Sequence, residues 1–151
     1  MPIVYGVNAS PFVRKVRVFL AEKGIAYELD PVIPVNVSAE FRKMSPLGKV
    51  PAFRDGDRTL SDSSIICAYL ERMHPQPALY PADAYDYARA LWFEEYGDGG
   101  LSGVIGAKKP GQTIKLGLRR AEGKGEYKKM TVEVTLAKRP NSVPNPNTPQ
   151  G

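Results

Sequence analysis

Apolar and polar positions alternate along the first hundred residues in a way that predicts several short elements. The run "IVYGV" at 3–7 is apolar and rich in β-formers, which predicts a buried strand that ends at Asn8. Ser10-Pro11 then supplies an N-cap and a proline at the first helical position. Apolar residues recur at helical spacing from Phe12 to Leu20, and the chain reaches a helix-ending glycine at Gly24.

The next fifty residues continue the alternation of strands and helices. "AYELDPVI" predicts a second strand, residues 38–44 a short helix capped by Ser38, and residues 50–60 two strands around the turn Asp55-Gly56. Another helix begins at Asp62-Ser63. A strand, a crossover helix and a strand imply a parallel pair, whereas the tight turn implies an antiparallel one. The order β-α-β-α-β-β-α therefore predicts an α/β fold with a mixed four-stranded sheet and three flanking helices.

A further amphipathic helix is expected from about Asp83 to Tyr96, with a packed side formed by Ala84, Ala88, Leu91 and Trp92. Beyond it, apolar residues alternate with polar ones at Ile114, Leu116 and Leu118, and again at Val132, Val134 and Leu136. This pattern predicts two half-buried strands in a hairpin, which needs a docking partner because a lone hairpin is marginal in water.

The net charge of +5 is distributed unevenly along the chain. Residues 1–101 hold 11 Lys+Arg against 13 Asp+Glu, whereas residues 102–151 hold 10 against 3. This shift and the glycines between Gly97 and Gly103 mark a boundary near residue 100. The basic tail suggests nucleic acid, but it lacks an aromatic stacking platform beyond Tyr127, so a nucleic-acid partner is not expected.

Residue counts exclude several kinds of chemistry. The single cysteine, Cys67, excludes an internal disulfide and a cysteine-clustered zinc site, and the single histidine, His74, removes most metal sites and most Ser/His catalysis. Cys67 is expected to be a small buried hydrophobe, and His74 to end a helix. The sequence has no apolar run of about 18 residues and no secretory signal. We therefore expect a soluble, cytoplasmic protein with no metal and no membrane partner.

Three motifs, in order and at their spacings, resemble the N-terminal thioredoxin-like domain of cytosolic glutathione S-transferases of the serine type: "SPFVRKVRVFLAEKGIAYE", "SPLGKVPAF" and "LSDSSIICAYLE". The likeness covers residues 1–80, and "DAYDYARALWFEEY", within 81–99, resembles the first helix of the family's helical second domain. It implies a thioredoxin-like fold with a truncated second domain. It also implies glutathione as co-substrate, a hydrophobic electrophile as second substrate and a homodimer.

The resemblance assigns activation of the glutathione thiol to Ser10. A serine hydroxyl at a helix N-terminus can donate a hydrogen bond to sulfur, and the helix dipole favours the thiolate there. Together these effects could lower a thiol pKa by about one to two units. Ser10 as a cap alone is the structural alternative, and Tyr5 and Asn8 are rival sulfur donors, although Tyr5 lies within a strand and is expected to pack in the core.

The other two motifs supply the expected glutathione-binding residues. Val50-Pro51 matches the position of the family's cis peptide, where the Val50 backbone would pair with the cysteinyl amide, but the sequence does not distinguish cis from trans. Lys49 is positioned to reach the glycyl carboxylate. Asp62 and Ser63 open a helix suited to the γ-glutamyl carboxylate and ammonium, and both are equally good caps.

Residues 100–140 contain "IGAKKPGQTIKLGLRR" and "MTVEVTLAKRP", which resemble the closing part of a bacterial PDZ domain, and residues 141–151 are expected to be disordered. The peptide-capturing loop of that family has no match here, so peptide binding does not carry over. The family's second-substrate wall is also missing from this chain. We therefore expect glutathione binding with weak or absent transferase activity, and a non-catalytic interaction module is the alternative.

Overall fold

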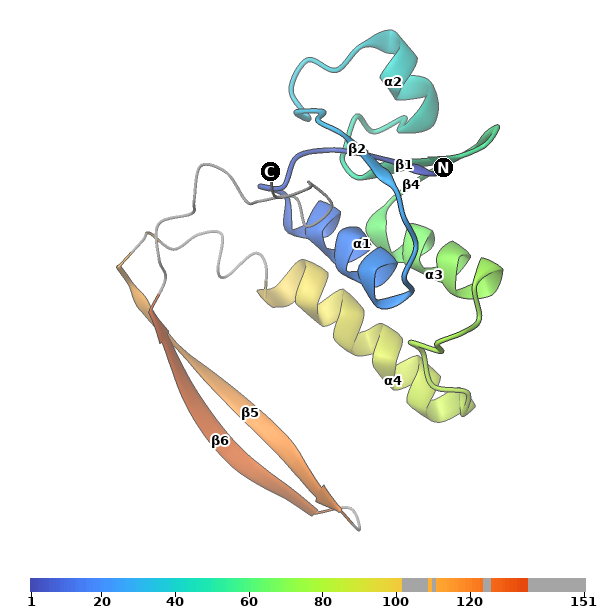
Figure 1. Ribbon diagram of the computed structural model, residues 1–151. Coiled ribbons are helices and arrows are strands. Elements are labelled where there is room, and N and C mark those ends of the chain that lie inside the picture. The colour runs from blue at the N-terminus through green and yellow to red at the C-terminus, as the bar shows by residue number, and fades with distance from the viewer. Residues whose placement is uncertain (102–108, 110, 124–125, 136–151) are drawn as a thin grey trace, which may run out of the picture. The chain divides into compact units, whose positions relative to one another are not determined.

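The computed structural model describes residues 1–101, 109, 111–123 and 126–135 (Figure 1). The chain divides into two units, Met1–Gly100 and Leu101–Gly151. Each unit is described here by itself.

The first unit alternates strands and helices in the predicted order. Its elements are β1 (Ile3–Tyr5), α1 (Pro11–Glu22), β2 (Glu28–Asp30), α2 (Ala39–Met44), β3 (Ala52–Asp55), β4 (Arg58–Ser61), α3 (Ser63–Met73), α4 (Ala84–Glu95) and the π-helical turn η1 (Tyr96–Leu101). His74 caps the C-terminus of α3, as the sequence predicts.

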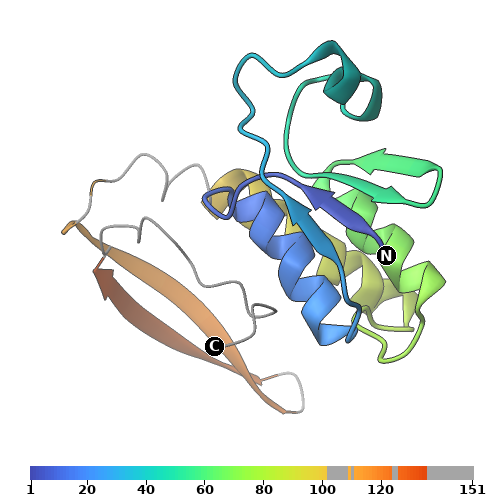
Figure 2. The ribbon, with the colours of Figure 1, turned by 45° about the horizontal axis from the view of Figure 1, so that its top comes forward.

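The strands form a mixed four-stranded sheet in the order β2-β1-β3-β4. β1 pairs with β2 in parallel, with Val4 opposite Leu29, and with β3 in antiparallel, with Val4 opposite Phe53. β3 and β4 form the predicted hairpin. α1 and α3 cover one face of the sheet, and α2 lies on the other side (Figures 1 and 2). This is the thioredoxin-like arrangement that the resemblance implies.

Capping side chains fix where the helices begin. Ser10 Oγ accepts a hydrogen bond from the Val13 amide at the start of α1, and Ser38 Oγ accepts one from Phe41 at the start of α2. Asp62 caps α3 and Asp83 caps α4 in the same way. Because each cap satisfies backbone amides that lack an intrahelical partner, short polar residues in the sequence are enough to set these boundaries.

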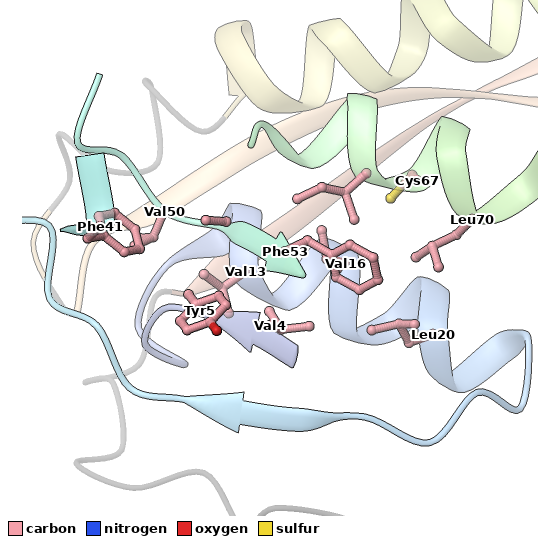
Figure 3. Packing of buried hydrophobic residues seen from close by; sticks show 12 residues of the cluster. Val4, Tyr5, Val13, Val16, Leu20, Phe41, Val50, Phe53, Cys67 and Leu70 are labelled. Atoms are coloured by element: carbon pink, nitrogen blue, oxygen red, sulfur yellow. The ribbon is translucent and has the colours of Figure 1, made fainter. Parts of the chain in front are cut away.

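The core of this unit lies between the sheet and its helices. Val4, Val13, Val16, Leu20 and Ile66 are fully buried, and Phe53, Cys67 and Leu70 nearly so. Figure 3 shows the labelled side chains of α1 and α3 gathered around Phe53 of the central strand β3. Burial of Cys67 agrees with its expected role as a small hydrophobe.

The packed side predicted for α4 is wrong at three of its four positions. Ala84, Ala88 and Trp92 are exposed, and Trp92 is 61% accessible. Leu91 is half-buried as predicted, and the other half-buried positions of α4 are Ala90 and Glu94. Glu94 is drawn inward by polar partners, because Tyr80 donates to its Oε2 and Lys15 pairs with its Oε1. Periodicity located the helix, but these long-range polar contacts set its rotation.

A buried lysine fixes the segment between α3 and α4. The Lys23 ammonium, with no exposed side-chain surface, pairs with Glu71 Oε2 at 2.6 Å and donates to the carbonyls of His74 and Pro77. Glu71 Oε1 in turn accepts from the amides of Leu79 and Tyr80. These contacts hold the linker against the ends of α1 and α3.

The second unit contains a β-hairpin at the predicted place. β5 (Thr113–Gly123) and β6 (Glu126–Thr135) pair in antiparallel, with Ile114 opposite Val134 and Leu116 opposite Val132. The turn between the strands, Leu136 and the tail 141–151 predicted to be disordered lie outside the described residues. In the part of the chain that the structure describes, no helix has the length and apolar character to cross a membrane.

Candidate functional site

The N-terminus of α1 presents the Ser10 hydroxyl. Ser10 Oγ accepts from the Val13 amide at 3.4 Å, and the Ser10 carbonyl accepts from Arg14. The Ser10 hydroxyl donates no hydrogen bond to any of the residues that the structure describes. The hydroxyl can therefore cap the helix as an acceptor and still donate its proton to a ligand, which are the two roles that the sequence analysis considered.

The two rival sulfur donors, Asn8 and Tyr5, contact other side chains of this unit. Asn8 Oδ1 accepts a hydrogen bond from the buried Arg17 guanidinium, which also donates to the Tyr27 hydroxyl. Tyr5 is 8% exposed and packs edge-on against Phe41 in the core. Tyr5 is therefore packed in the core, as the sequence predicts, and Asn8 is held through its amide oxygen, which leaves its amide N–H groups as donors.

The Val50–Pro51 peptide is cis, the isomer that the sequence left open. Neither the amide nor the carbonyl of Val50 makes a hydrogen bond to the residues that the structure describes. The preceding turn is held by Ser45, whose hydroxyl donates to the Lys49 carbonyl at 2.8 Å. The loop thus offers a short backbone edge that can pair with an extended peptide.

Asp62 and Ser63 begin α3 directly beside this loop. The Asp62 amide donates to the Pro51 carbonyl, and Asp62 Oδ1 accepts from the amides of Ser64 and Ile65. Asp62 has a φ of 82°, which is unusual for a residue with a side chain. Strained residues of this kind persist where the surrounding structure enforces them, commonly at binding sites.

One cavity brings these motifs together. It encloses about 330 Å³ and is lined by all five residues that the sequence analysis assigned to glutathione: Lys49, Val50, Pro51, Asp62 and Ser63. Ser10 does not line this cavity, but Phe12, two residues further along α1, does. The structure therefore joins two of the three motifs in one hollow and places the start of the α1 helix at its border.

Sequence reasoning missed the opposite wall of the cavity. Glu95, Asp98 and Gly99, from the end of α4 and from η1, line it together with Ser64. Ser64 Oγ lies 3.3 Å from Glu95 Oε1 and 3.4 Å from Asp98 Oδ2. No local pattern signals this role, because acidic residues at the end of an amphipathic helix are ordinary surface residues.

Lys15 supports this wall from α1. Its ammonium pairs with Asp98 at 2.5 Å and with Glu94 at 2.6 Å, and it donates to Ser64 Oγ at 2.9 Å. Burial favours the neutral amine, but the hydrogen bonds to Asp98 and Glu94 outweigh it and raise the pKa of Lys15 above its ordinary value. Lys15 is therefore a permanent cation at neutral pH.

Metal binding has no support in the described part of the chain, which contains no cluster of three or more His, Cys, Asp or Glu side chains suited to an ion. The Cys67 thiol is buried, and desolvation raises its pKa to about 12. Because the thiolate is the reactive form, Cys67 is unsuited to nucleophilic chemistry.

Comparisons with known proteins point to one family. Residues 4–78 match the family model described as "Glutathione S-transferase, N-terminal domain". Over 140 residues the chain is 33% identical to glutathione S-transferase Z1 of Arabidopsis thaliana. This match covers 89% of this chain and 58% of that protein. It is 38% identical to the uncharacterized GST-like protein YibF of Escherichia coli, over 62% of this chain and 47% of that protein.

Solved structures agree with these relatives. A glutathione S-transferase from Rhodospirillum rubrum superimposes with a TM-score of 0.64 at 34% identity, over 68% of this chain and 47% of that one. A glutathione transferase homolog from Drosophila mojavensis, solved with bound glutathione, superimposes with a TM-score of 0.60 at 33% identity. This match covers 69% of this chain and 53% of that one. The chain spans about half the length of these relatives. The family model matches residues 4–78, whereas the similarity to glutathione S-transferase Z1 extends over 89% of the chain. None of these comparisons supports the PDZ resemblance of residues 100–140, which stays a prediction.

Proposed function

Since residues 4–78 form a glutathione S-transferase N-terminal domain, we propose that the protein binds glutathione in the cavity between the cis-proline loop and the start of α3, and that Ser10 activates the bound thiol. The observation that carries this proposal is that Lys49, Val50, Pro51, Asp62 and Ser63 line a single hollow. Its volume, about 330 Å³, lies at the lower end of the range of small-molecule sites.

Each part of the tripeptide has a complementary group. The Ser63 hydroxyl and the first amides of α3 suit the γ-glutamyl carboxylate, because a helix N-terminus favours negative charge. The unpaired Val50 backbone suits the cysteinyl amide. Lys49 is exposed at the rim, where its ammonium can reach the glycyl carboxylate. This arrangement orients the cysteinyl thiol toward the α1 side of the cavity.

Activation of that thiol is the proposed role of Ser10. A hydrogen bond from its hydroxyl to a thiolate contributes about 1.5 to 3 kcal/mol, and the dipole of α1 adds about 0.3 to 1 kcal/mol. Each 1.36 kcal/mol lowers the thiol pKa by one unit, so a shift of about one to two units is expected. A much larger fraction of the bound glutathione would then be thiolate near neutral pH and ready to attack a hydrophobic electrophile.

A helix-capping control separates activation from stability. Ser10→Ala should raise the pKa of bound glutathione, measured by thiolate absorbance against pH, by about one to two units. Ser38→Ala removes a hydroxyl with the same capping geometry at α2 and should leave that pKa unchanged. An equal effect of the two substitutions would show that Ser10 only caps.

Turnover by this 151-residue chain is proposed to be weak. The described residues provide the glutathione side of the site and a single helix, α4, beyond it, whereas the relatives are about twice as long. Precise positioning of the second substrate supplies several kcal/mol of a barrier, so its loss should reduce the rate strongly. A chromogenic chloroarene should show little conjugation, and turnover comparable with a full-length relative would contradict this.

The alternative function is a non-catalytic interaction module, and the exposed aromatic side chains of α4 and of Tyr96 at its end favour it. Tyr85, Trp92, Phe93 and Tyr96 are between 54% and 71% exposed. Retention on immobilised glutathione that is lost in Ser63→Ala supports the first proposal, since Asp62 still caps α3 in that variant. A folded protein without retention supports the alternative. The same exposed side chains support a homodimer, which light scattering after gel filtration would detect.

A further inference from the structure

A second cavity, of about 330 Å³, lies on the side of the sheet where α2 packs (Figures 1 and 2). None of the residues that line it also lines the proposed glutathione cavity. Successive side chains of a strand point to opposite faces, so Tyr5 and its partner in register, Asp30, leave the sheet on the face opposite Val4. Arg54 pairs with Ile3, two residues before Tyr5, and leaves the sheet on the same face. Tyr5, Asp30 and Arg54 therefore face one cavity, and all three line it.

Tyr5 is the buried member of this group. It is 8% exposed, and its ring packs edge-on against Phe41 of α2 with the ring centres 6.4 Å apart. Its hydroxyl nevertheless makes no hydrogen bond to the residues that the structure describes. Buried polar groups in proteins nearly always have a partner. Because the ring is held by Phe41 and lines the cavity, Tyr5 offers its hydroxyl in a fixed position to a molecule that enters there.

Asp30 and Arg54 bring opposite charges to the same cavity without pairing with each other. Neither side chain makes a hydrogen bond or an ion pair within the described part of the chain. Asp30 is on β2 and Arg54 is on β3, with β1 between them, so the strands that carry them lie about 10 Å apart. The other polar side chains of the wall are already engaged, since Glu40 pairs with Lys43 and Ser38 caps α2. A small molecule can therefore stand between the charges of Asp30 and Arg54.

The rest of the cavity wall is apolar. It consists of Val32, Phe41 and Met44, of which Phe41 is buried and the other two are half-buried. An unbranched methionine side chain adapts its shape to the apolar group that it contacts. A ligand that uses the whole wall must therefore carry an apolar group in addition to a positive and a negative charge.

From this geometry we infer that the cavity on the α2 side of the sheet binds a free α-amino acid with an apolar side chain. Asp30 accepts hydrogen bonds from its ammonium, and Arg54 and the Tyr5 hydroxyl donate to its carboxylate. Hydrogen bonds between charged groups are the stronger ones in proteins, and a guanidinium can hold both oxygens of a carboxylate. This binding site goes beyond the proposed function, because it uses none of the residues proposed to bind glutathione.

Three ligands that share one apolar group test this site. L-Leucine carries both charges, whereas 3-methylbutylamine lacks the carboxylate and 4-methylpentanoate lacks the ammonium. Calorimetric titration of the full chain should show leucine binding about five- to tenfold more tightly than either analogue. Each analogue leaves one of the two charged side chains of the cavity without a partner.

Substitutions assign the contacts to single residues. Tyr5→Phe keeps the ring and removes only the hydroxyl, so it should weaken leucine binding about three- to tenfold. Arg54→Gln should reduce the preference for leucine over 3-methylbutylamine to less than twofold, and Asp30→Asn should do the same for 4-methylpentanoate. Arg58→Gln is the matched control, since it removes an exposed cation of β4 that does not line the cavity, and it should leave leucine binding unchanged.

Two results would overturn the inference. The first is that wild type does not bind leucine or binds all three ligands equally. The second is leucine binding that glutathione abolishes and that Tyr5→Phe leaves unchanged, because leucine would then occupy the glutathione cavity instead. Thermal unfolding of each variant checks that it is folded, and the comparison of the three ligands on wild type needs no variant.

Discussion

Gly6 and Val50 approach each other so closely that a Cβ on Gly6 would lie 3.1 Å from the Val50 Cβ. The same Cβ would lie 2.5 Å from Cγ2 of Val13, which is fully buried in α1. Gly6 also has a φ of 146°. The turn after β1 can therefore bring the start of α1 next to the cis-proline loop only because residue 6 has no side chain.

Gly6→Ala should destabilise the protein and weaken glutathione binding together. The added methyl group collides with rigid core atoms, and overpacking of this kind costs about 1 to 3 kcal/mol in addition to the backbone strain. Urea unfolding and calorimetric titration measure the two effects. Gly56→Ala is the control, since Gly56 also has positive φ but faces open space, so it should cost about 1 kcal/mol and leave binding unchanged.

Lys23→Met should cost about 2 to 4 kcal/mol of unfolding free energy. The substitution leaves the Glu71 carboxylate and the carbonyls of His74 and Pro77 without their buried donor. Lys43→Met breaks an exposed pair with Glu40 and should change stability by less than about 0.5 kcal/mol. Equal stabilities of the two variants in urea would show that the linker is not held by Lys23.

Acid should remove part of the stability that Glu71 provides. Burial favours the neutral acid, but the Lys23 hydrogen bond and those from the Leu79 and Tyr80 amides outweigh it and lower the pKa of Glu71 in the folded protein. Because the folded pKa lies below the unfolded one, the stabilisation is complete above about pH 5 and is lost as the pH falls through the folded pKa. The difference in melting temperature between wild type and Glu71→Gln should therefore be largest near pH 7 and shrink below about pH 4.

Cys67 should be inert toward thiol reagents while the protein is folded. Its side chain is 1% exposed, and desolvation raises its pKa to about 12, so the thiolate is scarce at pH 8. An aromatic disulfide reagent should detect no thiol in native protein and one per chain in guanidinium, since the sequence has a single cysteine. Rapid labelling of native protein would indicate frequent opening between α1 and α3.

Local patterns were enough to predict the elements, and the family resemblance selected five residues that line one cavity. Ser10-Pro11, Ser38 and Asp62 define helix starts by capping backbone amides within the next three residues, and the structure has each helix at the predicted place. The five residues assigned to glutathione fell in two short motifs, and sheet pairing brought these motifs to one cavity. The helix starts could be predicted because each depends on neighbours in the chain, and the sheet because a β-α-β order has few possible topologies. The five cavity residues were predicted through the family resemblance.

The tertiary structure decided the rotation of α4 and the composition of the acidic wall. Lys15 meets Glu94 and Asp98 from about eighty positions away in the sequence, and no periodicity encodes such a pairing. The close approach of Gly6 to Val50 likewise joins segments that are distant in the sequence. The isomer at Pro51 was left open by the sequence and is cis in the structure. Helix caps and strand patterns depend on interactions between residues that are close in the sequence. The charge of a cavity wall depends instead on which faces of separate elements pack together.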